Sequence, residues 1–159
     1  MKKLISIVTF LFLAITAYSQ SAEKITDILN SAEINYGQAC YLSAIHQNLI
    51  TEDSSYENAV QVLFDNKQLP ELTPCYNPIT AANLAFIYLT CWPNLKGSFM
   101  YRLTKGSPRY AYKQLKADGI FDDYTDPTTV FSGEEALMIL TACMIEYGSE
   151  EECMEMQTE

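Results

Sequence analysis

Apolar residues recur at three- and four-residue intervals along most of the chain, and polar or turn-forming residues separate these segments. This spacing predicts helices, because residues three and four apart share one face of an α-helix. No segment alternates apolar and polar residues for long enough to predict a strand. We therefore expect a mainly α fold, in which the almost uniformly apolar segment from Ile79 to Trp92 is the central buried helix. The predicted helices lie near residues 22–29, 35–48, 55–66, 80–92, 107–118 and 132–147, and residues 94–106 are expected to be irregular or partly helical around 99–103.

Capping residues mark where several of these helices begin. Thr80 is the expected N-cap of the central helix, since a hydroxyl side chain accepts a bond from a free backbone N–H of the first turn. Ser107 precedes Pro108, whose missing N–H costs nothing at the first helical position. Ser132 and Glu135 have the spacing of a capping box.

Part of this pattern repeats at an offset of 52 residues. A shortened third copy precedes the other two, because the segments INYGQ (34–38), ITAAN (79–83) and FSGEE (131–135) follow one pattern of an apolar residue and then a capping residue. We expect one compact domain over 20–148, built from helix–loop–helix repeats at about 22–48, 55–92 and 107–147. The matched residues are Ser55, Ala59, Leu63, Thr80, Asn83, Ile87 and Cys91, and then Ser107, Ala111, Leu115, Ser132, Glu135, Ile139 and Cys143.

The first nineteen residues have the organisation of a signal peptide. Lys2 and Lys3 precede an apolar run from Leu4 to Ala17, and small residues precede an expected cleavage site before Gln20. The run is shorter than the ~20 residues that span a bilayer, and no second such run follows. We expect an exported bacterial protein of the periplasm or cell surface without a transmembrane segment after cleavage, ending in an acidic flexible tail at 149–159.

Charge is unevenly distributed in this acidic chain. The net charge is −10, and removal of the two signal-peptide lysines makes it −12, which argues against nucleic acid as a partner. Between Glu71 and Asp118 there is no acidic residue, although six of the eight remaining basic residues lie there. This segment is either a binding face for an anionic polymer or partner, or a solvated surface balanced by acids from elsewhere. The candidate binding residues are Lys96, Arg102, Lys105, Arg109, Lys113, Lys116, Tyr101 and Tyr112.

Residues with catalytic or metal-binding chemistry are few. The only histidine, His46, lies six residues after Cys40, which places the two about 240° apart on a helix and excludes a dyad there. The five cysteines contain no CxxC motif, so we expect no metal site and no cofactor. The cysteines in apolar helical segments are expected to be buried, whereas Cys75 and Cys153 are expected to be accessible.

The acidic connector after residue 121 has two interpretations. Asp122, Asp123 and Asp126 form either a solvated turn or the acid and base of a small hydrolase. Their spacing does not match a twelve-residue calcium loop. Because no other catalytic constellation is present, we expect a protein that is not an enzyme.

The segments INYGQ, ITAAN and FSGEE and the two longer repeats resemble the S-layer homology family, whose second helix opens with a pattern like ITRAE. The resemblance implies a bundle of three repeats with pseudo-threefold symmetry and noncovalent attachment to cell-wall polymers. The arginine that the family uses in polymer binding is replaced here by Tyr36, Ala81 and Gly133. These replacements remove a bidentate donor, so the fold is expected to remain while the inherited site is lost.

These observations favour an exported, non-enzymatic envelope module that binds a cell-wall polymer or an envelope protein. Two alternatives remain open. One is a small wall-modifying hydrolase that uses the acidic connector, and the other is a protein-interaction subunit that has lost carbohydrate binding.

Overall fold

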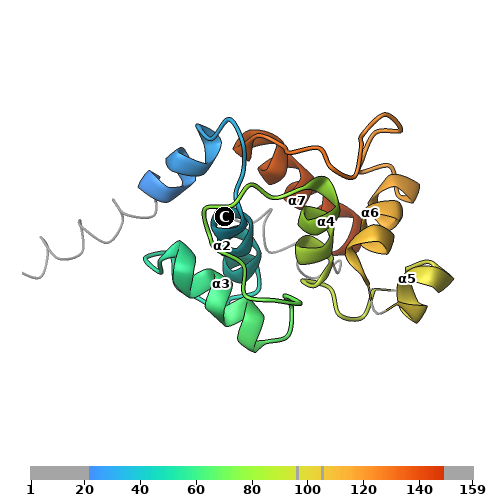
Figure 1. Cartoon of the computed structure of the whole chain (residues 1–159), viewed down its shortest axis with the longest axis horizontal. Helices are drawn as coiled ribbons and strands as arrows, with labels where there is room; N and C mark the ends of the chain where they lie inside the picture. The colour runs from blue at the N-terminus through green and yellow to red at the C-terminus, as the bar shows by residue number, and fades with distance from the viewer. Residues whose placement is uncertain (1–21, 96, 105, 149–159) are drawn as a thin grey trace, which may run out of the picture.

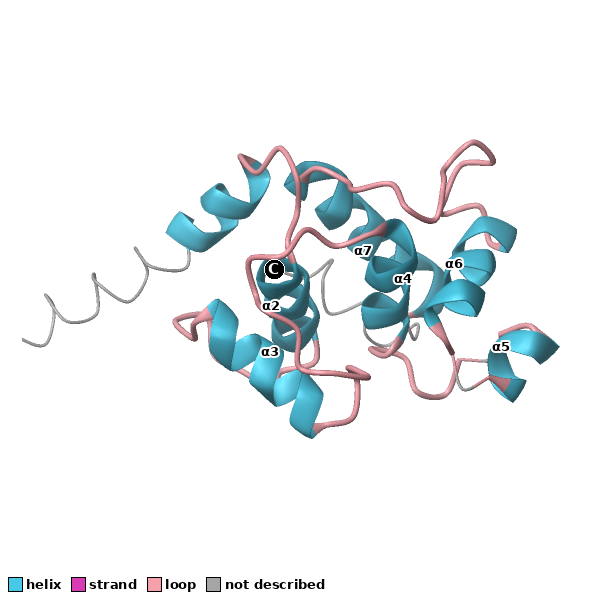
Figure 2. Ribbon diagram, in the orientation of Figure 1, coloured by secondary structure: helices cyan, strands magenta, loops and turns pink. Residues whose placement is uncertain are grey.

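The computed structural model describes residues 22–95, 97–104 and 106–148, and these form a single helical domain (Figures 1 and 2). No β-strand is present among the described residues, which confirms the mainly α prediction. A helix over 22–29 comes first. The helices that follow are α2 (Tyr36–His46), α3 (Tyr56–Asp65), α4 (Ala81–Leu89), α5 (Phe99–Leu103), α6 (Pro108–Ala117) and α7 (Gly133–Tyr147).

Helix α4 is the central helix of the domain, as its apolar sequence predicts. It contacts α2, α6 and α7, while α2 also contacts α3 (Figure 1). Leu84, Ile87 and Tyr88 on α4 are fully buried. The second helix of one predicted repeat thus packs mainly on the first helix of the next repeat, as α2 does on α3 and α4 does on α6.

The predicted caps stand at the starts of their helices, but only Ser132 caps through its side chain, since Thr80 and Ser107 make no capping hydrogen bond. The capping box of Ser132 and Glu135 is present, and Asn35 forms a second one with Gln38 at the start of α2. Thr80 occupies the N-cap position of α4, but its side chain does not cap the helix and instead accepts a bond from the Asn83 amide at 3.2 Å. The prediction that the central helix reaches residue 92 was wrong, because α4 ends at Leu89 and the chain continues as tight turns.

The three segments that precede α2, α4 and α7 lie together, although they are far apart in sequence. The N–H of Ile34 donates to the carbonyl of Phe131 at 2.8 Å, and the N–H of Ile79 donates to the carbonyl of Ile34 at 3.1 Å. Ile34 and Ile79 are completely buried. Isolated β-bridges join Asn35 to Pro78 and Thr80 to Val130.

The first N–H of each of these helices is satisfied by the loop before another helix. Tyr36 donates to Asn77 at 3.0 Å, Ala81 donates to Thr129 at 2.7 Å, and Gly133 donates to Ser31 at 2.9 Å. These bonds form a closed cycle between the repeats. The first repeat donates to the second, the second donates to the third, and the third donates to the first. A superposition of the α3–α4 pair on the α6–α7 pair stays a prediction.

Helix α7 begins in close contact with the helix at 22–29. A Cβ atom on Gly133 would lie 1.7 Å from the carbonyl oxygen of Ile28, so only glycine fits at this position. Ile28 itself is 1% exposed. This contact joins the first and last described helices of the domain.

Candidate functional site

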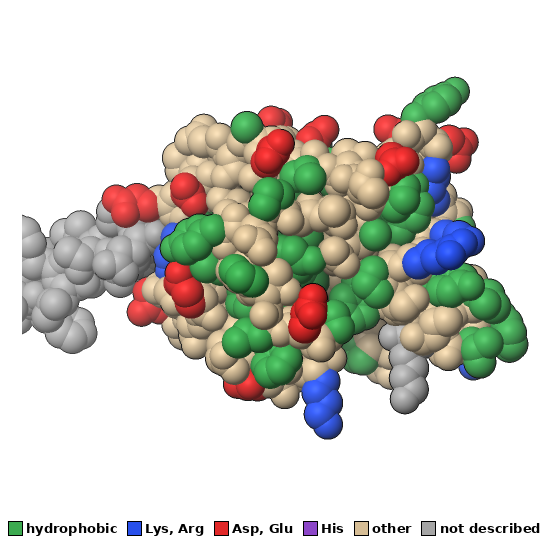
Figure 3. All heavy atoms as spheres, viewed as in Figure 1, with side chains coloured by type: hydrophobic (Ala, Val, Ile, Leu, Met, Phe, Trp, Pro, Cys, Tyr) green, Lys and Arg blue, Asp and Glu red, His purple; other side chains and the backbone are tan. Residues whose placement is uncertain are grey.

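The predicted basic residues that the structure describes lie on two neighbouring helices. Arg102 is on α5, while Arg109, Lys113 and Lys116 are on α6, and α5 contacts α6. In Figure 3, Lys and Arg side chains over α6 lie beside hydrophobic side chains over α5. Lys96 and Lys105 lie outside the described residues.

Three of these cations have exposed side chains. Arg102, Arg109 and Lys113 form no ion pair with any carboxylate in the described part of the chain. The ammonium of Lys113 lies 5.5 Å from the centre of the Tyr110 ring, in cation–π geometry. We call Arg102, Arg109 and Lys113 the basic face.

The nearest acid after the basic segment does not neutralise this face. Asp118, which caps the end of α6, accepts a hydrogen bond from the amide of Gln114 at 2.8 Å and another from the hydroxyl of Tyr147. The Asp118 carboxylate therefore forms its hydrogen bonds between α6 and α7, and it forms none with the residues of the basic face. Tyr147 in turn packs on Trp92 with ring centres 5.7 Å apart.

Lys116 and Tyr112 have a different role from the one that the sequence predicted. Lys116 donates to the carbonyl of Asp123 at 2.5 Å, and both Lys116 and the Tyr112 hydroxyl bond to the carbonyl of Thr125. Tyr112 is only 8% exposed, and its ring packs on Phe121. These two side chains hold the acidic connector on α6, so they support the basic face rather than extend it.

Tyr101 also supports the site from inside. A Cβ atom on Gly97 would lie 2.7 Å from the ring of Tyr101, and one on Gly106 would lie 3.0 Å from its hydroxyl oxygen. Ser98, the N-cap of α5, donates its N–H to Gln114 on α6 at 2.7 Å. Together these contacts fix the position of the short helix α5 against α6.

An apolar surface on α5 was missed by the sequence analysis. Phe99 and Leu103 on this short helix are 75% and 65% exposed. Their spacing of four residues, with Arg102 three residues after Phe99, was the available signal, because such residues share one helix face.

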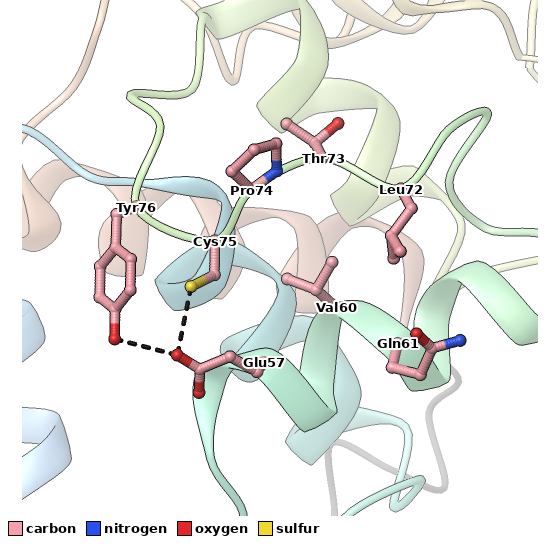
Figure 4. A pocket seen from close by; sticks show the side chains of 8 residues that line it. All are labelled: Glu57, Val60, Gln61, Leu72, Thr73, Pro74, Cys75 and Tyr76. Atoms are coloured by element: carbon pink, nitrogen blue, oxygen red, sulfur yellow. Dashed lines mark hydrogen bonds between the residues drawn. The ribbon is translucent and has the colours of Figure 1, made fainter.

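A separate candidate site is a cavity between α3 and the loop that precedes α4 (Figure 4). It is a groove of about 440 Å³ with largely apolar walls, among them Val60, Leu72 and Pro74. At one end, the carboxylate of Glu57 accepts hydrogen bonds from the Tyr76 hydroxyl at 2.9 Å and the Cys75 thiol at 3.4 Å. We call this cavity the Glu57 groove.

The Glu57 carboxylate is held in its charged form. Hydrogen bonds from the backbone at the start of α3, from Tyr76 and from Cys75 lower its pKa below the usual value. No lysine or arginine in the described ranges forms an ion pair with it. No local sequence signal marked this groove, because its two walls meet only when the loop folds onto α3.

Cys40 and Cys143 are buried as predicted, whereas Cys91 is only half-buried, because it lies in the turns after the end of α4. Burial raises the pKa of the Cys40 thiol to about 12 and that of Cys91 to about 11, and it also raises the pKa of Cys143. The expectation that Cys75 is accessible was wrong, since it is 8% exposed and packs between Glu57 and the start of α2. Cys153 lies outside the described residues.

The acidic connector shows little sign of catalytic geometry. Asp122, Asp123 and Asp126 are exposed, and Asp126 accepts bonds from the backbone and hydroxyl of Thr128. Asp122 and Glu135 both line a groove of about 320 Å³, but the capping bonds from Ser132 lower the pKa of Glu135. A carboxyl group with a lowered pKa is a poor proton donor, so Glu135 is poorly suited to act as a general acid.

The described residues contain no group of three or more His, Cys, Asp or Glu side chains that is arranged to hold a metal ion. Among the same residues, no helix has the length and apolar character needed to cross a bilayer. No protein-family model, curated protein or solved structure matches this chain.

Proposed function

We propose that this chain is an exported, non-enzymatic binding module of the bacterial envelope, and that its basic face binds an anionic cell-wall polymer. Support comes chiefly from one observation. Arg102, Arg109 and Lys113 are exposed on adjoining helices without an ion pair to any described carboxylate. Clustered unpaired cations raise the local potential and attract polyanions, even on a protein whose net charge is negative.

The signal-like residues 1–19 support export, and export brings a bacterial protein to the compartment that contains the anionic cell-wall polymers. Arginine is suited to such a ligand, because its planar guanidinium donates two parallel hydrogen bonds to one phosphate or carboxylate group. The Tyr110 ring beside Lys113 adds a surface on which a sugar ring stacks.

We also infer that the three repeats form a pseudo-threefold bundle. The hydrogen bonds from Tyr36, Ala81 and Gly133 run in one direction around the three segments, which is the pattern that such symmetry produces. This arrangement agrees with the resemblance to S-layer homology repeats, although the arginines of that family are absent. Polymer binding here is therefore assigned to a different surface, the basic face.

The test is co-sedimentation of the purified protein with purified sacculi. We expect Arg109→Glu to weaken binding about fivefold to tenfold, which corresponds to about 1 to 1.4 kcal/mol. Raising the salt from 0.05 to 0.5 M should weaken wild-type binding, because exposed charges are screened within ~10 Å at 0.1 M.

Lys67→Glu is the matched control, because Lys67 is exposed, lies outside the basic face and undergoes the same change of charge. Its binding should equal that of the wild type. If R109E and K67E weaken binding equally, net charge rather than the basic face governs attachment. Binding that withstands both R109E and high salt would refute the proposal.

An envelope protein is the second candidate partner, and the exposed side chains of Phe99 and Leu103 favour it. Apolar side chains of this size on a short exposed helix are typical of protein contacts. Crosslinking to envelope proteins in the absence of sacculus binding would support this function instead.

A further inference from the structure

Helix α5 presents a preformed apolar and cationic surface to solvent. Phe99, Arg102 and Leu103 are spaced three and four residues apart, so they lie on one face of the helix. All three are exposed, while Tyr101 points the other way and anchors the helix against Gly97 and Gly106. Because α5 is already held in place, binding through this face costs little ordering entropy. We call Phe99, Arg102 and Leu103 the α5 knob.

The Glu57 groove has the complementary chemistry. Its walls include the apolar side chains of Val60, Leu72 and Pro74, and its one carboxylate has no cation partner among the described residues (Figure 4). Hydrogen bonds from Tyr76 and Cys75 orient that carboxylate. The groove therefore fits a ligand that combines apolar side chains with one cation.

The knob and the groove belong to different parts of the molecule. In Figure 1, α3 lies beside α2 in the lower left part of the molecule, whereas α5 lies below α6 at the right, with α4 between the two pairs. The knob of one molecule cannot enter its own groove, but it is free to enter the groove of a neighbour.

We propose that the Glu57 groove binds the α5 knob of a second copy of this chain, so that the protein associates head to tail. Phe99 and Leu103 pack on the apolar walls, and the Arg102 guanidinium pairs with the Glu57 carboxylate. This goes beyond polymer binding and does not depend on it. The contact takes Arg102 out of the basic face, while Arg109 and Lys113 remain available to a polymer.

The contact is heterologous, because two different surfaces meet. Each copy in a dimer keeps one unused knob or groove, so association continues beyond the dimer into open chains or closed rings. A single small contact is weak, and we expect a dissociation constant on the order of 100 μM. Arrays of this kind form where the protein is locally concentrated.

The experiment is sedimentation velocity of the purified protein from 10 μM to 1 mM. Wild type should gain mass with concentration, and Glu57→Arg and Arg102→Glu should each remain monomeric. An equimolar mixture of E57R and R102E should associate again. In the mixture, the unchanged knob of E57R meets the unchanged groove of R102E, and the two substituted surfaces also carry opposite charges. The double variant should recover association because its substituted knob and groove attract each other in the same way.

Phe99→Ser should abolish association without any change of charge, whereas Lys67→Glu should associate as the wild type does. Circular dichroism at 222 nm shows whether each variant is folded, and Leu72→Arg, at a residue that is 56% exposed, replaces E57R if that variant unfolds. A wild type that stays monomeric at 1 mM overturns the proposal. So does a mixture of folded variants that fails to associate. No polymer is present, so either result leaves the wall-binding proposal standing.

Discussion

The contact between Gly133 and Ile28 gives the sharpest test of how the first and last described helices pack. In Gly133→Ala, the new Cβ would lie 1.7 Å from the Ile28 carbonyl oxygen and 2.6 Å from its carbonyl carbon. Backbone atoms cannot rotate away as a side chain does. The helix at 22–29 must therefore move off the start of α7, or α7 must begin later.

The magnitude follows from what this movement removes. Ile28 is 1% exposed, and full burial of an isoleucine contributes about 1.5 to 3 kcal/mol. The bond from the Gly133 N–H to Ser31 contributes about 1 kcal/mol more. Alanine offsets at most about 1 kcal/mol of this loss, because it favours the helix more than glycine does. The expected loss of unfolding free energy is about 2 kcal/mol, or about 8 °C in Tm.

Urea denaturation followed by circular dichroism at 222 nm measures this loss. Glu134→Ala is the control, since Glu134 is the next residue of α7 and is exposed, and we expect it to change stability by less than about 0.5 kcal/mol. Ile28→Ala combined with G133A should cost less than the two separate changes added, because both remove the same burial. If G133A is as stable as the wild type, the close packing of these helices is refuted.

Two further predictions concern thiol reactivity and acid stability. At pH 8, Cys91 and Cys143 should react with a bulky maleimide many times more slowly in the native protein than in urea. The reason is that burial raises the pKa of both thiols. Rapid labelling of Cys91 in the native protein would contradict this. The pKa of Glu135 is lowered by the bonds that it accepts from Ser132, so its charge stabilises the folded protein above about pH 4.3 and loses that effect as the pH falls through the folded pKa. Glu135→Gln keeps the capping box, so its urea midpoint should fall less than that of the wild type between pH 5 and pH 3, and equal decreases would argue against the assigned role of Glu135.

Local structure could be predicted from the amino-acid sequence alone. Helix positions followed from the three- and four-residue spacing of apolar residues, and starts followed from caps such as Ser132 with Glu135. Both signals are local, because they depend on side chains and backbone groups within one or two helical turns. For residues 94–106 the sequence left open an irregular segment or a partly helical one, and the structure has the short helix Phe99–Leu103 there. The grouping of bases between Glu71 and Asp118 was likewise visible in the sequence.

The roles of the individual site residues depend on tertiary packing. Sequence spacing placed Tyr112 and Lys116 with the other basic-face residues, but the connector folds onto them and takes up both side chains. Cys75 was predicted to be accessible from its loop position, yet the loop packs on α3 and buries it. The Glu57 groove exists for the same reason, since residues 72–76 form its second wall.

The exposure of a side chain and its ionic partners depend on which segments of the chain pack together. A local sequence pattern does not determine which segments these are. The exchange of partners between repeats is the clearest case, because Tyr36 bonds to Asn77 and Gly133 to Ser31 across long stretches of chain. The capping residues in the sequence predicted where α2 and α7 begin. The packing of the whole domain decided which carbonyl group accepts the first N–H of each helix.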